Sequence, residues 1–278
     1  VVPQTSGQNP DLLDPRFQKI FHENYPQQDD MLPEMFPSVT HNGRNNMTFS
    51  SVGAFEDWGE FSGTVDYQSV AEGYDTTITY VEFASGFQVT RTLMDDDQYQ
   101  IMDQKPMGLA TAARRTRQKH GARILNNAFS VDTYFYNNSE GLALCSNSHT
   151  TRAPGVSTSS GFDNLVTTAL TATAVASAVI QASNFRDDRG NRIDVNMDEM
   201  WYPQDLYEEA FEIVNSMGQV DTANNNRNVH FGAYTLKKWR YLKDANNWFM
   251  TDSSLRKQMV GWIDRVAIEF AMAEDLDT

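Results

Sequence analysis

The 278-residue sequence predicts a mixed α+β fold, and three patterns indicate it. From Met47 to Met94, apolar and polar residues alternate with the period of β-strands. Residues 95–129 change to helix-forming types with helical spacing, and beyond residue 160 short helical and strand-like segments follow one another. Strands and helices that occupy separate runs of a chain are typical of α+β proteins.

Residues 1–45 are interpreted as an extended N-terminal arm, because they hold six of the nine prolines and a single short apolar patch. That patch is formed by Phe17, Ile20 and Phe21. A segment with so little core of its own is either disordered or lies on another surface. We therefore expect an arm that needs support from elsewhere, for which a neighbouring subunit is one candidate.

Residues 46–92 are predicted to form a long β-hairpin. The alternation is clearest over 78–83 and 87–93, so we place the turn at Ser85–Gly86. Between residues 46 and 90 the charge has one sign, because the segment has seven acids and neither Lys nor Arg. The acids are Glu56, Asp57, Glu60, Asp66, Glu72, Asp75 and Glu82.

A long helix is predicted over residues 95–129. Asp95–Asp97 suit the positive end of its dipole, and Pro106 predicts a kink or restart. At about 1.5 Å per residue this helix would reach roughly 50 Å, so the subunit is expected to be elongated. The expected apolar stripe consists of Met102, Leu109, Ala113, His120, Ile124 and Ala128.

Shorter elements are predicted in the second half. They are a polar loop over 137–161, a helix over 163–182, a strand around Met200–Tyr202, a helix opened by Pro203 that buries Leu206, Ala210, Ile213 and Val214, and strand-like segments at 229–234 and 266–272.

The charges of the long helix and the hairpin are complementary. Residues 104–131 contain six basic residues and no acid, the opposite of the hairpin. Complementary patches fix the register of self-assembling subunits, so we expect the two segments to meet between copies. The predicted assembly contacts are Glu56, Asp57, Glu60 and Asp66 on the hairpin, and Arg114, Arg115, Arg117 and Lys119 on the helix or facing a neighbour's arm.

Composition excludes several classes of protein. No run approaches the roughly 18 apolar residues of a membrane helix, and the first residues lack the pattern of a signal peptide. Cys145 is the one cysteine, which rules out an internal disulfide and a Cys-rich zinc site. An RNA- or DNA-reading helix at 114–123 is an alternative, although the net charge of −15 opposes it.

Catalytic signatures are mostly missing from the sequence: it has no phosphate-binding loop, HExxH motif or nucleophile elbow. Cys145 with His149 is the strongest enzymatic candidate, yet both fall in a polar loop. A metal-dependent hydrolase that binds its ion through aspartates is the second enzymatic candidate. Its candidate ligands are Asp95–Asp97 or Asp187, Asp188 and Asp194, for which capping and turn formation are the simpler explanations. We expect no catalytic residue, cofactor or metal.

The order of the parts resembles the major capsid proteins of tailed phages with the Hong Kong 97-like fold, in particular the Mu-like major head subunit group. Three short segments carry the resemblance. They are Gly141–Ser146 with His149, Trp201–Pro203 running into a helix at Asp205, and Asn246–Met250. The last resembles a turn of roughly DxNxWFL found in phage capsid chains.

The resemblance implies a division of the chain into the parts of that fold. These are an N-arm at 1–45, an extended loop at 46–92, the spine helix and part of the peripheral domain at 93–160, further peripheral elements and the axial domain at 161–260, and a strand that returns to the peripheral domain at 261–278. Family members commonly continue with another strand and the chain lacks an initiator Met, so we expect the sequence to be a trimmed version of a longer chain.

The resemblance also implies a function: pentamers and hexamers of the subunit would form an icosahedral shell around double-stranded DNA. The protein would belong to the virion and assemble in the host cytoplasm, without contact to a membrane. Scaffold, portal and cement proteins are further implied partners, and an encapsulin-type nanocompartment shell is the alternative within the fold. The founding member crosslinks its shell through a Lys of the extended loop, and this loop has no Lys, so we predict no such crosslink.

Overall fold

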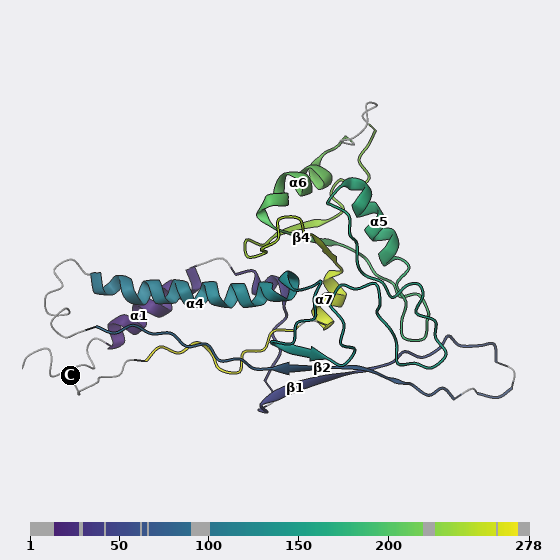
Figure 1. Cartoon of the computed structure of the whole chain (residues 1–278), viewed down its shortest axis with the longest axis horizontal. Helices are drawn as coiled ribbons and strands as arrows, with labels where there is room; N and C mark the ends of the chain where they lie inside the picture. The colour runs from purple at the N-terminus through teal and green to yellow at the C-terminus, as the bar shows by residue number, and fades with distance from the viewer. Residues whose placement is uncertain are drawn as a thin grey trace, which may run out of the picture.

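The computed structural model describes residues 14–27, 30–41, 43–61, 63–65, 67–89, 101–218, 226–259 and 261–271. The molecule is elongated: a long helix extends to one side, a wedge of smaller elements rises from the middle, and a two-stranded loop projects to the other side (Figure 1). Within the described part of the chain no helix is long and apolar enough to cross a membrane.

The long helix is α4, Ile101–Asn126, and it runs continuously through Pro106 rather than restarting there. The predicted stripe is partly confirmed, since Met102 and Ala128 are buried. The rest of the buried face is rotated from the prediction and consists of Pro106, Ala110, Gln118, Gly121, Ala122 and Leu125. Ala110, Gly121 and Ala122 on this face let other segments approach the helix closely. The predicted helix start at Asp95–Asp97 lies outside the described residues.

Residues 14–27 of the N-terminal segment are helical rather than extended. Helix α1, Asp14–Asn24, packs along α4 of the same chain, followed by the 3-10 turn η3, Tyr25–Gln27. Phe17 and Phe21 of the predicted apolar patch are buried there. The expectation that the segment rests on another surface is therefore met within the same subunit.

Helix α2, Leu32–Met35, packs into the main core. Leu32, Met35 and Phe36 are buried together with Trp201 and Trp239 in one cluster. The segment around α2 therefore packs into the same cluster as these two tryptophans.

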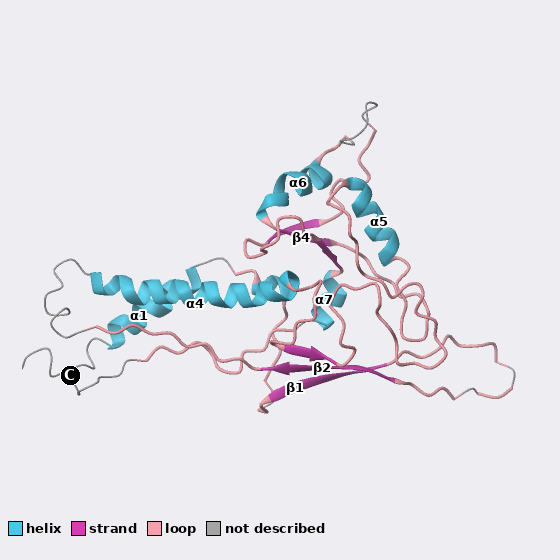
Figure 2. Cartoon of the chain, in the orientation of Figure 1, coloured by secondary structure: helices cyan, strands magenta, loops and turns pink. Residues whose placement is uncertain are grey.

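The predicted hairpin exists, but its strands and turn differ from the prediction. Strand β1, Asn46–Val52, pairs antiparallel with β2, Glu72–Thr79, and β3, Tyr136–Asn138, extends the sheet in the order β1-β2-β3. The connection is therefore the loop 53–71, and the predicted turn at Ser85–Gly86 is wrong. Figure 2 shows the loop as the projection beyond these strands.

Residues 80–89 form no strand and run back along α4. The ring of Phe83 lies 4.2 Å from that of His120, and the ammonium group of Lys105 lies 6.0 Å from the ring centre of Phe87. Alternation of residue types correctly indicated an extended backbone here. It could not show whether another strand or a helix lies beside it.

A second sheet has the order β5-β4-β6. The central strand β4, Glu199–Tyr202, confirms the predicted strand; it is parallel to β5, Thr235–Lys238, and antiparallel to β6, Phe249–Thr251. All four of its residues are buried, as expected of a strand covered on both faces. Trp201 faces the cluster with α4, while Met200 and Tyr202 face a second cluster.

The helices around this sheet follow the prediction in part. After the 3-10 turn η4, Gln204–Leu206, helix α6, Tyr207–Asn215, buries Ala210, Ile213 and Val214 as predicted. Helix α5 is Ala172–Ala182 and so begins later than residue 163, at a position where Thr171 accepts a hydrogen bond from the backbone N–H of Ala174. Helix α7 is Ser253–Met259.

Two predicted C-terminal strands are not formed. Residues 229–234 make turns before β5 begins, and the described part of 266–272 is an unpaired run, drawn in yellow beneath α4 in Figure 1. The ring of Phe270 stacks on Phe21 of α1, with the two ring centres 5.2 Å apart. As with residues 80–89, the strand-like pattern marks an extended segment that packs beside helices.

Candidate assembly surfaces

The loop 53–71 is largely exposed, and many of its exposed side chains are large and apolar. Trp58 is 95% exposed and Tyr67 is 91% exposed. Phe55, Phe61 and Val65 are exposed as well. A soluble chain gains nothing by holding large apolar side chains in water, so a cluster of them marks a surface that another molecule covers.

The base of this loop is held by the turn at residues 187–190. Asp188 accepts a 2.7 Å hydrogen bond from the backbone N–H of Ala54. The Arg189 guanidinium donates to the backbone oxygens of Ala54 and Ser69 on the two strands of the loop, and lies 3.3 Å from the Glu56 carboxylate. The subunit therefore fixes where the loop leaves the body.

Close packing at Gly53 adds to this attachment. Its backbone N–H donates to the Ala71 oxygen at 2.9 Å. A Cβ at this position would overlap the Asp188 carboxylate and approach the Ala71 oxygen to 2.8 Å. Glycine therefore lets the two strands and the supporting turn meet.

The predicted acidic contacts differ in their surroundings. Glu56 has a partner within its own chain, Arg189. Asp57 and Glu60 are exposed, and no ion pair joins either of them to another described residue. Asp66 lies outside the described residues.

Arg114 and Arg117 are paired within their own subunit. Arg114 lies 3.0 Å from Asp30, and its guanidinium lies 5.2 Å from the ring centre of Tyr25. Arg117 donates two 2.7 Å hydrogen bonds to Asp264. Burial disfavours the charge of Arg117, but the hydrogen bonds and the carboxylate charge outweigh it and raise the pKa of the guanidinium.

Arg115 and Lys119 are exposed on α4. Neither has an ion-pair or ring partner among the residues that the structure describes. The structure thus divides the predicted basic residues into two that stabilise the subunit and two that face solvent.

Cys145 and His149 do not form a catalytic pair. His149 Nδ1 lies 2.9 Å from a carboxylate oxygen of Glu140, and its Nε2 lies 3.3 Å from the Leu144 backbone oxygen. Burial raises the pKa of the Cys145 thiol to about 11, so the thiolate is scarce at neutral pH.

Two of the aspartate candidates for a metal, Asp187 and Asp188, serve the local fold, whereas Asp95–Asp97 lie outside the described residues. Asp187 accepts hydrogen bonds from the backbone N–H groups of Arg189 and Asn191, which is ordinary turn formation. Asp188 supports the loop, as described above. Across the described ranges no group of three or more His, Cys, Asp or Glu side chains could hold a metal ion.

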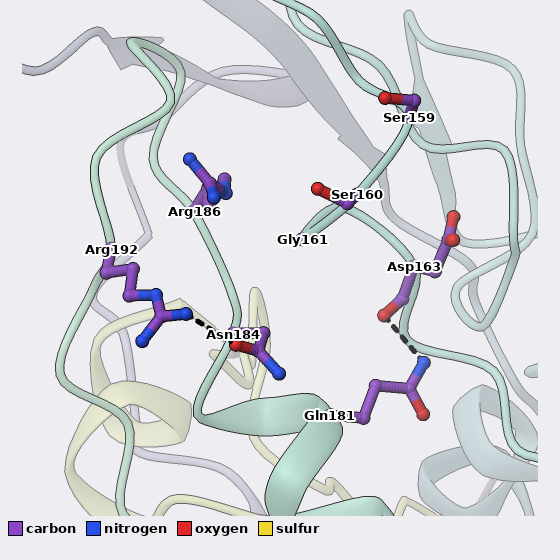
Figure 3. A pocket seen from close by; sticks show the side chains of 8 residues that line it. All are labelled: Ser159, Ser160, Gly161, Asp163, Gln181, Asn184, Arg186 and Arg192. Carbon is purple, nitrogen blue, oxygen red and sulfur yellow. Dashed lines mark hydrogen bonds between the residues drawn. The ribbon is translucent and has the colours of Figure 1, made fainter.

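Figure 3 shows a polar pocket between the segment 159–163 and the end of α5. The Arg192 guanidinium donates to the side-chain oxygen of Asn184 at 2.9 Å, and Gln181 donates to the Asp163 backbone oxygen at 2.8 Å. Arg186, Arg192 and Asp163 share the lining, so the pocket carries charges of both signs.

Reasoning from charge alone missed the aromatic side chains of the loop. The signal was present in the sequence, because Phe55, Trp58 and Phe61 recur every third residue in an acidic segment whose alternation is weak. Aromatic residues that fit neither a strand nor a helix with its own core are candidates for an interface.

Comparisons with known proteins agree on one class of protein. The model of a family described as phage capsid protein matches residues 73–277. Two solved structures, titled bacteriophage JBD30 capsid and capsid of bacteriophage JBD30 decorated with minor capsid protein trimers, each match with a TM-score of 0.57 at 15% identity, over 87% of this chain and 100% of that chain. The procapsid of bacteriophage JBD30 matches with a TM-score of 0.52 at 15% identity, over 86% of this chain and 100% of that chain. No curated protein matches.

Proposed function

Because the chain belongs to the phage capsid protein family, we propose that it is the major subunit of a phage head and forms pentamers and hexamers of an icosahedral shell around double-stranded DNA. The family match and the fold shared with capsid subunits indicate a structural role in the virion rather than an enzymatic one. The finer assignment, a Hong Kong 97-like fold of the Mu-like group with the domain division given above, forms part of the proposal.

The exposed loop 53–71 is the observation that carries the proposal. It projects from the body (Figure 1). Its aromatic side chains Phe55, Trp58, Phe61 and Tyr67 are exposed in the described part of the subunit. Burying one such ring is worth about 2 kcal/mol, so several of them supply a substantial part of an assembly contact. In a shell made of one major subunit, the natural cover for this loop is a neighbouring copy.

Charge complementarity is the second support. We propose that Glu56, Asp57, Glu60 and Asp66 form one side of the contact between copies, and Arg114, Arg115, Arg117 and Lys119 the other. Exposure favours Asp57, Glu60, Arg115 and Lys119 as direct contacts. Glu56, Arg114 and Arg117 are paired within the subunit, and they would instead maintain the conformation of the two contact surfaces.

Other components of the head are proposed by analogy. One of the similar solved structures is described as decorated with minor capsid protein trimers, so a cement protein is a proposed partner here. Scaffold and portal proteins, non-specific contact with packaged DNA and assembly in the host cytoplasm complete the proposal. Covalent crosslinking through a loop lysine is not expected, because residues 46–90 contain no Lys.

Electron microscopy of the purified chain, combined with sedimentation, tests the proposal. Closed polyhedral particles, or rings of five and six subunits, are the expected result. A species that stays monomeric at high concentration and also when expressed with the other head proteins of its phage would contradict the shell role. A denaturing gel of the particles should show the monomer band and no ladder of covalent multimers.

A further inference from the structure

We infer that the pocket of Figure 3 binds a phosphate group between the guanidinium groups of Arg186 and Arg192. This inference goes beyond the proposed function, because a ligand site on the subunit does not require a shell. The two arginines flank the turn 187–190, which holds the base of the loop 53–71.

The backbone places Arg186 and Arg192 directly opposite each other, because the two residues form an antiparallel bridge. Two backbone hydrogen bonds flank the bridge: they run from the N–H of Asp187 to the oxygen of Asn191 at 2.8 Å, and from the N–H of Ile193 to the oxygen of Phe185 at 3.0 Å. In this arrangement opposed side chains lie closest, and like charges directly opposite each other are destabilising. An anion shared by both guanidinium groups would remove this repulsion.

Neither arginine of the pocket has a carboxylate partner among the described residues. Arg186 donates to the Gly190 backbone oxygen at 2.7 Å, and Arg192 donates to the side-chain oxygen of Asn184 at 2.9 Å, so each guanidinium has only a neutral acceptor. Six other arginines do have a carboxylate partner in the same chain: Arg16, Arg114, Arg117, Arg123, Arg189 and Arg256. The chain has 37 acidic residues, so this exception at one pocket indicates an anion from outside the chain.

The nearby carboxylates are directed elsewhere. Asp163 lines the pocket, but its side chain points away from both arginines in Figure 3. Asp187 accepts hydrogen bonds from the backbone N–H groups of Arg189 and Asn191 in its own turn. The two positive charges therefore prevail at the centre of the pocket.

The opposite wall of the pocket supplies further donors and a close fit. The hydroxyl groups of Ser159 and Ser160 belong to the lining. The N–H of Arg186 donates to the Gly161 oxygen at 3.0 Å, and a Cβ at Gly161 would come within 2.7 Å of the Arg186 side chain. Glycine thus lets this wall close on the arginine stem. The pocket has a volume of about 390 Å³, which is typical of a site for a small ligand.

The charge of the site favours a phosphate group over a carboxylate. A phosphate monoester carries a charge of about −1.5 to −2 at pH 7 and three acceptor oxygens, enough for both guanidinium groups and a serine hydroxyl. A carboxylate would neutralise one arginine only. Inorganic phosphate and the terminal phosphate of a nucleic acid share the required chemistry. A phosphodiester of the DNA backbone carries one charge and matches the pair less well.

Isothermal titration of the unassembled subunit with inorganic phosphate, at constant ionic strength, tests the inference. The wild type should bind with one saturable site per subunit. Arg186→Gln and Arg192→Gln should each weaken binding by about tenfold or more, because each removes a charged hydrogen-bond donor. Absence of saturable binding to the wild type, or equal affinity of the wild type and Arg192→Gln, would overturn the site.

A matched control is the variant Arg227→Gln with Arg240→Gln, which changes two exposed arginines outside the pocket and should leave the affinity for phosphate unchanged. In chloride buffer the thermal midpoints of all variants should stay within about 2 °C of the wild type, so that weaker binding is not a sign of unfolding. An equal loss of affinity in the control would show that phosphate responds to net charge and not to the pocket.

Hydrogen exchange of the wild type locates the ligand. Phosphate should protect the backbone of residues 159–163 and 184–192, and protection confined to other segments would contradict the assignment. A DNA oligonucleotide with a 5′-phosphate should displace inorganic phosphate, whereas the same strand without it should not. Equal displacement by both strands would assign the site to the diester backbone and overturn the choice of ligand. None of these results depends on whether the subunit forms a shell.

Discussion

Arg117 and Asp264 are joined by two parallel hydrogen bonds of 2.7 Å, one from each terminal nitrogen of the guanidinium to each carboxylate oxygen. The pair ties the middle of α4 to the run of residues 261–271, which forms no strand. Trp262 completes the contact by donating its indole N–H to Asp264 at 2.9 Å. The C-terminal run is therefore held by these side chains in addition to the backbone hydrogen bonds that Trp262 makes with Pro37 and Val39.

Arg117→Ala should lower the free energy of unfolding of the subunit by about 1 kcal/mol, since the pair is forked but partly exposed. Urea denaturation of the unassembled protein measures this. Arg115→Ala is the matched control and should change the free energy by less than about 0.5 kcal/mol. Equal effects of the two substitutions would refute the assignment of Arg117 to an internal role.

Substitution of Arg256 should lower the free energy of unfolding far more than substitution of Arg117. Arg256 is buried, donates to both carboxylate oxygens of Glu199 at 2.8 and 3.0 Å, and donates to the Met35 backbone oxygen. Arg256→Ala leaves a buried carboxylate without its partner, which costs about 3–5 kcal/mol. The measurement is thermal or urea unfolding, with Lys257→Ala at the exposed neighbouring position as control. A loss below about 1 kcal/mol would show that the pair is solvated.

Two glycines of α4 should respond to alanine with opposite signs. A Cβ at Gly121 would overlap Leu32, whereas nothing lies within 4 Å of one at Gly108. Gly108→Ala should stabilise the subunit by up to about 1 kcal/mol through helix propensity. Gly121→Ala should destabilise it by about 1–3 kcal/mol through overpacking. Differential scanning calorimetry of both variants decides, and stabilisation by both would mean that α2 does not pack at this distance.

Acid stability should depend on Asp252. Although burial alone would raise its pKa, hydrogen bonds from Ser254, Asn196 and Leu255 outweigh it and lower the pKa from 3.8 to about 2. A lowered pKa stabilises the fold above the unfolded value and loses that contribution as pH falls. About 2 kcal/mol should therefore disappear between pH 4 and 2.

Unfolding measured across that range should show a smaller acid-induced loss for Asp252→Asn than for the wild type. The asparagine variant keeps one side-chain acceptor and cannot titrate. Parallel curves for the two proteins would argue against Asp252 as the titrating group.

The thiol of Cys145 should react slowly with alkylating agents in the folded subunit. With its pKa raised by burial to about 11 from 9.0, the thiolate fraction near pH 8 falls on the order of 100-fold. Alkylation by iodoacetamide, followed by mass spectrometry, should be slow in the native subunit and fast in urea. Because the chain has one cysteine, the signal is unambiguous. Rapid native alkylation would revive the nucleophile hypothesis.

The sequence was sufficient to predict an element where the local pattern of apolar residues matches the residues that are buried in the fold. The apolar run at Met200–Tyr202 and the face of Ala210, Ile213 and Val214 predicted a buried strand and an amphipathic helix, and both are present. The capsid family was likewise accessible from the order of the parts. In these cases a residue's environment is decided by neighbours close in the chain.

Pairing between distant segments could not be predicted. The alternation at 78–83 does not show that β2 pairs with residues 46–52. The positive charge of Arg114 and Arg117 does not show that Asp30 and Asp264 of the same chain already neutralise it. The sign of the charge and the period of the hydrophobic pattern can be read from a single segment. Which segments pair with each other depends on two segments that lie far apart in the sequence.

Holding the loop at its base has a mechanical consequence. Gly53, Asp188 and Arg189 fix its origin, and about nine residues separate that origin from the tip, a lever of roughly 30 Å at the rise of an extended chain. One degree of rotation at the base moves the tip by about half an ångström. Small adjustments of this pivot would let identical subunits meet at the different angles that the proposed closed shell requires.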